Sequence, residues 1–132
     1  MWRQLLLGSA ALGLASATHI TVLTFAIDHL PSIARDVAGF RWPLILTAFA
    51  AILVGHTLQV WIWALILKAI RAIGSLEDAI YFMLVTSTTL GYGDITLERK
   101  WRLFGAMAAV NGLLTFGLST AFLIEIFARS YG

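Results

Sequence analysis

Residues 86–94 read Thr86-Ser87-Thr88-Thr89-Leu90-Gly91-Tyr92-Gly93-Asp94, and the rest of the chain is best interpreted around this stretch. Hydroxyl side chains on consecutive residues are followed by two glycines that alternate with Leu90 and Tyr92, and then by a carboxylate. Gly91 and Gly93 accept positive φ at little steric cost, so the backbone can turn successive carbonyl oxygens to one side. Such a row of carbonyls, together with a threonine hydroxyl, can replace the water shell of an alkali cation. An ordinary glycine-rich turn is the alternative to such a cation-binding strand.

The composition predicts a membrane environment for this strand. Of 132 residues, 60% are hydrophobic and 12% are charged, and the mean hydropathy is +0.88. A soluble domain this apolar would precipitate, so we expect an integral membrane protein. The net charge of +2 is too small to indicate nucleic-acid binding. The chain contains no cysteine, which excludes disulfides and thiolate metal sites.

Apolar stretches of spanning length flank the strand. A helix needs about 20 residues to cross about 30 Å of hydrocarbon, and the candidate spans are residues 5–27, 42–68 and 103–128. The segment 75–87 is too short to span, and Ser75 and Asp78 predict its start as N-cap and capping-box residues. A short helix that runs into residues 88–94 predicts a re-entrant loop, because non-helical backbone at membrane depth must be buried or line water.

Residues 89–94 resemble the selectivity filter of potassium channels, which is usually written T-V/I-G-Y-G-D. The last span resembles the inner helix of the small bacterial two-span potassium channels, on the residues Arg102, Gly112, Phe116, Gly117 and Thr120. The resemblance implies an all-α integral membrane fold with three transmembrane helices per chain, a re-entrant pore helix and a selectivity filter, assembled as a tetrameric channel. It divides the chain into an N-terminal membrane helix (1–30) and a pore domain (42–132), made of an outer helix (42–68), a pore helix (75–87), a filter (88–94) and an inner helix (103–128).

The resemblance also implies a role for each matching residue. K⁺ is expected at the carbonyl oxygens of Thr89, Leu90, Gly91 and Tyr92, and Gly93 completes the ion-binding filter. The residues expected to support the filter are Asp94, Thr88, Tyr81, Phe82 and Val85. On the inner helix, Gly112 and Gly117 are read as a hinge or as close-packing positions, and Phe116 and Thr120 as cavity residues. Glu125 is read either as an ion pair with Arg129 or as part of an acidic ring at the inner mouth.

Four positions depart from the usual family pattern. Leu90 replaces a β-branched residue, which changes the packing behind the filter. Many family members carry a Trp pair that braces the filter tyrosine, and this chain has Tyr81 and Phe82 there. Bracing must therefore rely on packing or on the Tyr81 hydroxyl, since phenylalanine has no hydrogen-bond donor. Val85 stands where some members have a glutamate that pairs with the filter aspartate, so Asp94 needs another partner.

The first helix lies outside the resemblance. Ser9, Gly13 and Ala17 recur every four residues, and we expect this small-residue face to pack on the second span. We interpret His19 and His56 as residues that hydrogen-bond between helices, with proton sensing as the alternative.

Two further expectations concern the connecting and flanking residues. Trp61 and Trp63 are interpreted as an aromatic belt at the end of the second span. Residues 28–41, which include Pro31, are expected to form a polar interfacial loop.

The distribution of basic residues conflicts with the expected orientation. In potassium channels the pore loop enters from outside the cell, so a spanning first helix places the N-terminus outside as well. Arg35, Arg41 and Arg129 then lie inside. The basic residues outside are Arg3, Lys68, Arg71, Arg99, Lys100 and Arg102, against the positive-inside rule. We give the filter sequence more weight, because lysine and arginine near helix ends can extend to the interface.

The sequence and the resemblance together predict passive, selective potassium conduction by a homotetramer in a lipid bilayer. K⁺ is the permeant ligand, with no cofactor, no nucleic acid and no enzymatic activity expected. The expected location is multi-pass in a membrane, in particular the bacterial inner membrane. The alternatives are a poorly selective cation channel, or a non-conducting membrane subunit that packs with a larger channel.

Overall fold

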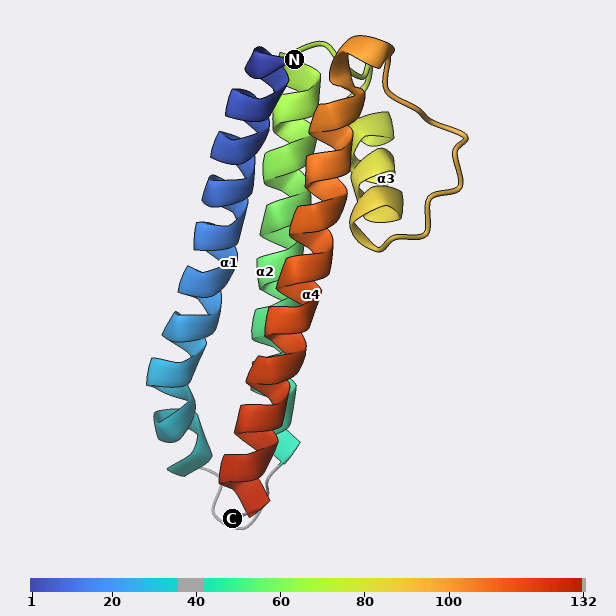
Figure 1. Cartoon of the computed structure of the whole chain (residues 1–132). Helices are drawn as coiled ribbons and strands as arrows, with labels where there is room; N and C mark the ends of the chain where they lie inside the picture. The colour runs from blue at the N-terminus through green and yellow to red at the C-terminus, as the bar shows by residue number, and fades with distance from the viewer. Residues whose placement is uncertain (36–41, 132) are drawn as a thin grey trace.

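The computed structural model describes residues 1–35 and 42–131, and in these residues it contains helices and no β-strand; the filter strand, residues 88–94, is irregular backbone. The elements are α1 (Trp2–Arg35), α2 (Trp42–Ala69), α3 (Leu76–Ser87), η1 (Arg99–Trp101) and α4 (Arg102–Tyr131). The long helices α1, α2 and α4 lie side by side, with α2 antiparallel to the other two, and the short α3 lies near the end that carries the N-terminus (Figure 1). The prediction of an all-α membrane fold is confirmed, since three helices are long and apolar enough to span: Trp2–His29, Pro43–Ala69 and Arg99–Ala128.

The start and the end of α3 follow from local polar contacts. The Ser75 hydroxyl accepts a hydrogen bond from the Asp78 backbone N–H at 2.9 Å, as the sequence predicts for an N-cap. Glu77 and Asp78 lie in the first turn, where the helix dipole favours negative charge. After Ser87 the chain leaves the helix and returns along an irregular loop to η1 (Figure 1). Helix α3 is therefore a short, capped helix that ends inside the depth of the bundle.

Helix α1 is longer than the 1–30 segment expected from the sequence. It continues through Pro31 to Arg35, so the first half of the predicted polar loop at 28–41 is helical. The remaining residues, 36–41, lie outside the described part of the chain. Proline removes one backbone donor, and membrane helices tolerate that loss where neighbouring bonds persist.

The face of α1 that packs on the bundle is not the one predicted. Ser9, Gly13 and Ala17 are exposed, and a Cβ on Gly13 would meet nothing within 4 Å. The buried stripe is Gly8, Ala11, Ala15, His19, Leu23 and Ala26. Both faces carry small residues, and the buried one also carries the imidazole of His19, which is bonded to Ser119. Burial of that polar ring against α4 gives a physical reason for the rotation of α1, because positions 8, 11, 15 and 19 share one helical stripe.

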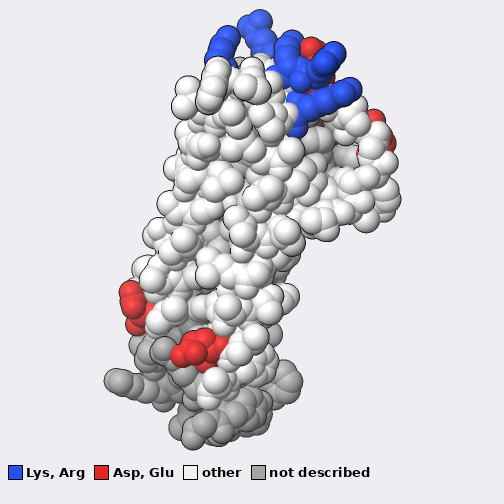
Figure 2. Space-filling view, viewed as in Figure 1, with Lys and Arg blue, Asp and Glu red and all other residues white. Residues whose placement is uncertain are grey.

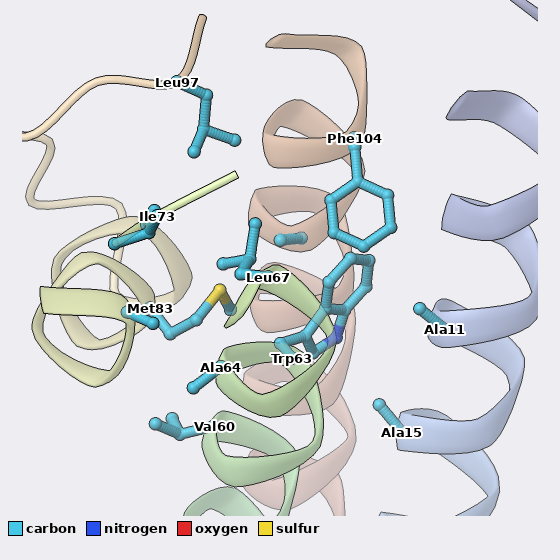
Figure 3. Packing of buried hydrophobic residues seen from close by; sticks show 12 residues of the cluster. Ala11, Ala15, Val60, Trp63, Ala64, Leu67, Ile73, Met83, Leu97 and Phe104 are labelled. Carbon is cyan, nitrogen blue, oxygen red and sulfur yellow. The ribbon is translucent and has the colours of Figure 1, made fainter. Parts of the chain in front are cut away.

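Trp63 belongs to the core, which corrects the aromatic-belt interpretation. Its side chain is fully buried, whereas Trp61 is 43% exposed, since two residues apart on a helix face different directions. Figure 3 shows the Trp63 ring beside Phe104, with ring centroids 4.9 Å apart. The indole N–H donates to Asn111 Oδ1 at 2.8 Å, and the Asn111 amide donates to the Ser16 hydroxyl at 2.8 Å. This bonded chain joins α2, α4 and α1.

Among the described residues, basic side chains are concentrated at one end of the bundle, whereas acidic side chains lie at both ends (Figure 2). The described basic side chains gather at the end that carries the N-terminus and η1 (Figure 2). Asp28 lies near the C-terminal end of α1 and Glu125 near the C-terminal end of α4, at the other end of the bundle. The N-terminus and the start of α3 share one end of the bundle (Figure 1), so the conflict with the positive-inside rule persists in the folded chain.

The packing of α1 generates a prediction about two glycines. A Cβ on Gly55 of α2 would lie 2.7 Å from His19 Nδ1, whereas Gly13 has open space around it. We expect Gly55→Ala to destabilise the bundle by about 1–3 kcal/mol, because the α1–α2 contact must shift. Gly13→Ala should be neutral or slightly stabilising, because alanine is the better helix former. Unfolding in mixed detergent micelles measures both free energies, and equal effects would contradict the observed rotation of α1.

Candidate functional site

The backbone of residues 89–93 alternates in conformation. Thr89, Gly91 and Gly93 have positive φ angles of 62°, 58° and 78°, while Leu90 and Tyr92 between them do not. Glycine adopts this region at little cost, as the sequence predicts for Gly91 and Gly93. An alternating strand of this kind is the conformation expected where successive carbonyls serve one row of ion sites.

Thr89 in the left-handed region is a feature that sequence reasoning did not anticipate. A β-branched residue with positive φ is a genuine outlier, and such strain costs of order 1–3 kcal/mol. Two backbone bonds hold the exit from α3 in this conformation: the Thr89 N–H donates to Thr86 O and the Gly91 N–H donates to Val85 O, both at 3.1 Å. No signal in the residue type could have predicted it, since threonine normally avoids this region.

The strand is almost unprotected on a single chain. Every residue from 88 to 94 is exposed, with Leu90 at 56% and Tyr92 at 68%. Polar backbone at membrane depth must line water or be covered by protein, because lipid offers it no hydrogen bonds. One chain therefore does not complete the surroundings of this strand.

Asp94 is bonded to a residue of α3. The Tyr81 hydroxyl donates to Asp94 Oδ2 at 2.6 Å, and this supplies the partner that Val85 cannot. This hydrogen bond holds the pKa of the Asp94 carboxyl below its usual range, and it raises the pKa of the Tyr81 phenol. The bond ties the end of the strand to the middle of α3.

The other predicted support residues contact the strand in different ways. Val85 is buried and acts through its backbone, since its carbonyl accepts from Gly91. Thr88 caps α3, and its hydroxyl donates to Leu84 O at 2.6 Å. Phe82 is partly buried and lines a cavity of about 410 Å³ together with residues 95–97 and α4. Tyr81 thus makes a polar contact with Asp94, and Phe82 makes apolar contacts in the cavity.

Gly112 of α4 lies directly against the C-terminal end of α3. A Cβ at this position would be 2.3 Å from the backbone oxygen of Ser87, so only glycine fits without movement. Gly117 has no such neighbour within 4 Å. Close packing therefore accounts for Gly112, and the two glycines differ in what surrounds them.

The remaining predicted residues of α4 follow Gly112 toward the C-terminal end of the helix. Phe116 is 42% exposed and stacks on the His56 ring at 4.2 Å. The Thr120 hydroxyl is exposed and donates to Phe116 O at 3.0 Å. Glu125 is exposed near the far end of α4, and the side chain of Arg129, its predicted partner, lies outside the described residues.

The Tyr81–Asp94 bond generates a prediction with a defined pH dependence. Tyr81→Phe removes the bond, so the pKa of Asp94 should rise toward the usual aspartate value of about 3.9. Because the folded-state pKa of Asp94 is depressed, the stabilising effect of the bond is present above the unfolded pKa and is lost as pH falls through the folded pKa. A carbon-13 NMR titration of the carboxyl measures the shift. Tyr92→Phe, which removes a nearby hydroxyl but not this bond, is the control, and an unchanged Asp94 pKa in Tyr81→Phe would contradict the assignment.

One family model, described as an ion channel, matches residues 44–129. The match begins in α2, includes α3 and the strand, and ends in α4, so it leaves α1 outside. No solved structure matches the chain. The match agrees with the resemblance to potassium-channel pore domains and with three helices capable of spanning a membrane. The chain therefore belongs to this ion channel family and is a multi-pass membrane protein of the two-span pore-domain type, with an additional N-terminal helix.

Proposed function

We propose that four copies of this chain form a channel that conducts K⁺ passively and selectively. The observation that carries the proposal is the strand at 89–93, with alternating backbone conformation and no cover on the single chain. One chain contributes one strand, and a closed ring of carbonyl oxygens needs several strands around an axis. Four is the number that the family resemblance implies.

In this proposal the carbonyls of Thr89, Leu90, Gly91 and Tyr92 bind dehydrated K⁺, and the Thr89 hydroxyl completes the innermost site. Gly93 allows the strand to leave the axis, and Asp94 is held by Tyr81. The C-terminal end of α3 carries the negative end of its dipole and lies between the two ends of the long helices (Figure 1). That end lowers the energy of a cation held below the strand.

Helix α4 then lines the inner half of the pathway. Phe116 and Thr120 face the cavity, Gly112 and Gly117 permit close packing or bending, and Glu125 forms an acidic ring that concentrates cations at the inner mouth. K⁺ is the only ligand the mechanism needs, and no step requires a cofactor or a catalytic group. The resemblance to small bacterial channels supports a bacterial inner membrane as the location.

Poor selectivity is the second candidate, because the chain departs from the family behind the filter. Leu90 is largely exposed, and Phe82 offers no hydrogen bond to the strand. A loosely held strand could coordinate Na⁺ as well as K⁺, whereas the Tyr81–Asp94 bond and the contact of Gly91 with Val85 favour a held strand.

Reversal potentials on purified, reconstituted protein test both candidates. We expect selective K⁺ permeation in the natural chain, and in Gly91→Ala or Gly93→Ala a loss of K⁺ over Na⁺ discrimination of more than about tenfold, or about 1.4 kcal/mol. The physical reason is that a Cβ opposes the positive φ at both positions. Gly74→Ala is the control, because Gly74 has neither positive φ nor a close neighbour. Unchanged selectivity in both filter variants would refute the proposed ion sites.

Native mass spectrometry in lipid-like nanodiscs tests the assembly. We expect one species of four times the 14.4 kDa chain. Only monomers or dimers would contradict the tetramer. A tetramer without ion flux would instead favour the non-conducting subunit.

A further inference from the structure

We propose that His19, Ser119 and His56 form a proton-binding site inside the bundle, and that proton uptake there favours channel opening. This inference deepens the proposed channel function and rests on it for its consequence on conduction. The site joins three helices: His19 from α1, His56 from α2 and Ser119 from α4. Helix α1 lies outside the segment that the ion channel model matches, so the site joins that segment to a helix beyond it.

The geometry brings both imidazoles to one hydroxyl. Ser119 Oγ lies 3.0 Å from His19 Nε2 and 3.2 Å from His56 Nε2, and the ring centroids are 4.6 Å apart. A serine hydroxyl carries one hydrogen, so it donates to one imidazole and accepts from the other. Nδ1 of His19 is buried and has no hydrogen-bond partner in the described part of the chain. When His56 Nε2 accepts the Ser119 hydrogen, His19 Nε2 is the donor, so His56 Nε2 and the buried His19 Nδ1 are available to a proton. When His19 Nε2 accepts that hydrogen instead, His19 Nδ1 carries its own hydrogen and His19 Nε2 is available.

Proton uptake balances without any other reactant. The imidazole that accepts from Ser119 takes a proton at its Nε2 and becomes a donor. The Ser119 oxygen then accepts from both rings, and its own hydrogen turns away from them. Two positive charges at this separation would repel strongly, so the pair takes up one proton as a unit.

No carboxylate faces the pair to neutralise this charge. The described titratable groups in contact are His19 on α1 and His56 on α2, and α4 contributes Ser119 and Phe116. The nearest acid along α4 is Glu125, six residues or about 9 Å further along the axis, and Asp28 lies beyond His19 on α1. The α3 residues that line the same cavity as His56 are Ile80, Leu84 and Ser87, none of which titrates. A charged pair in this position must therefore be stabilised by water.

A cavity beside His56 gives the ring room to turn and gives water a place to solvate it. His56 and Phe116 line a cavity of about 320 Å³ between α2, α3 and α4, and the cavity reaches Thr88 beside the filter strand. The neutral His56 ring stacks on Phe116 at 4.2 Å, which holds α4 in the observed arrangement. A protonated His56 gains hydration by turning into the cavity and leaving Phe116. The charged state therefore favours an inner helix moved away from its present contact, with a wider and wetter pathway.

Potassium flux from liposomes tests whether proton uptake at the histidine pair increases conduction. We expect about tenfold higher flux at about pH 4 than at about pH 8, a range that extends below the ordinary histidine pKa because burial disfavours the charged imidazolium, for a coupling of typical allosteric size. His56→Gln and His19→Gln should each reduce this ratio to less than about twofold. The matched control is His29→Gln, which changes the third histidine, an exposed residue near the far end of α1. A ratio in both variants equal to that of the natural chain, or a conducting natural chain without pH response, would overturn the proposal.

A second readout separates this site from the channel function. Nitrogen-15 NMR of histidine in nanodiscs should show linked titration of His19 and His56, lost in His56→Gln and broken into a single independent titration in Ser119→Ala. If the natural chain conducts no ions but shows the linked titration, the channel proposal fails and the proton site stands. Independent titration of the two rings in the natural chain would overturn the proton site, whatever the flux.

Discussion

The shortage of hydrogen-bond partners in hydrocarbon is the constraint on which the rest of this structure depends. Helices satisfy it internally, which explains why the described chain is three long helices, one short one and a 3₁₀ turn. The strand after α3 is the exception. Its backbone leaves the helix at Thr88, takes positive φ at alternate residues and stays exposed on one chain. Backbone without hydrogen-bond partners is expected at a functional site, where neighbouring copies of the chain and bound ions can supply those partners.

The same constraint governs the contacts between helices. Buried polar side chains lie along one side of α4, and each is bonded. Asn111 accepts from Trp63 and donates to Ser16, while Ser119 bonds both histidines. Hydrogen bonds between membrane helices each stabilise the structure by only about 0.6 kcal/mol on average. Their main effect here is to determine which helix faces contact one another. They orient α1 against the pore domain, so a helix outside the segment that the family model matches becomes part of the same bundle.

Contact between α3 and α4 connects the strand to the inner helix. Gly112 brings the α4 backbone against Ser87, and Phe116 reaches the cavity that Thr88 also lines. A displacement of α4 must therefore change the packing directly behind the strand. The inner helix, the end of α3 and the histidine pair form one continuous set of contacts, through which α1 can affect the filter.

Much of this architecture could be predicted from residues alone, because hydrophobic length and glycine spacing are local properties. Three spans, the Ser75 cap and the positive φ of Gly91 and Gly93 all follow from nearest neighbours in the sequence. The resemblance to ion channels was also readable, since six adjacent residues carry it. The sequence offers the Tyr81 hydroxyl as one possible brace, but it does not indicate that this hydroxyl reaches a carboxylate 13 residues away.

Other features were decided only by tertiary structure. Helix α1 carries two faces of small residues, and which one packs depends on where α4 places Ser119 for His19. The burial of Trp63 depends on Asn111, 48 residues away. The left-handed Thr89 depends on carbonyls of α3 that hold the strand against the preference of its residue type. For α1 and Trp63 the deciding partner is distant in the sequence, and for Thr89 it is the end of α3 that the chain has just left. The local sequence allows several arrangements in each case and does not indicate which one is adopted.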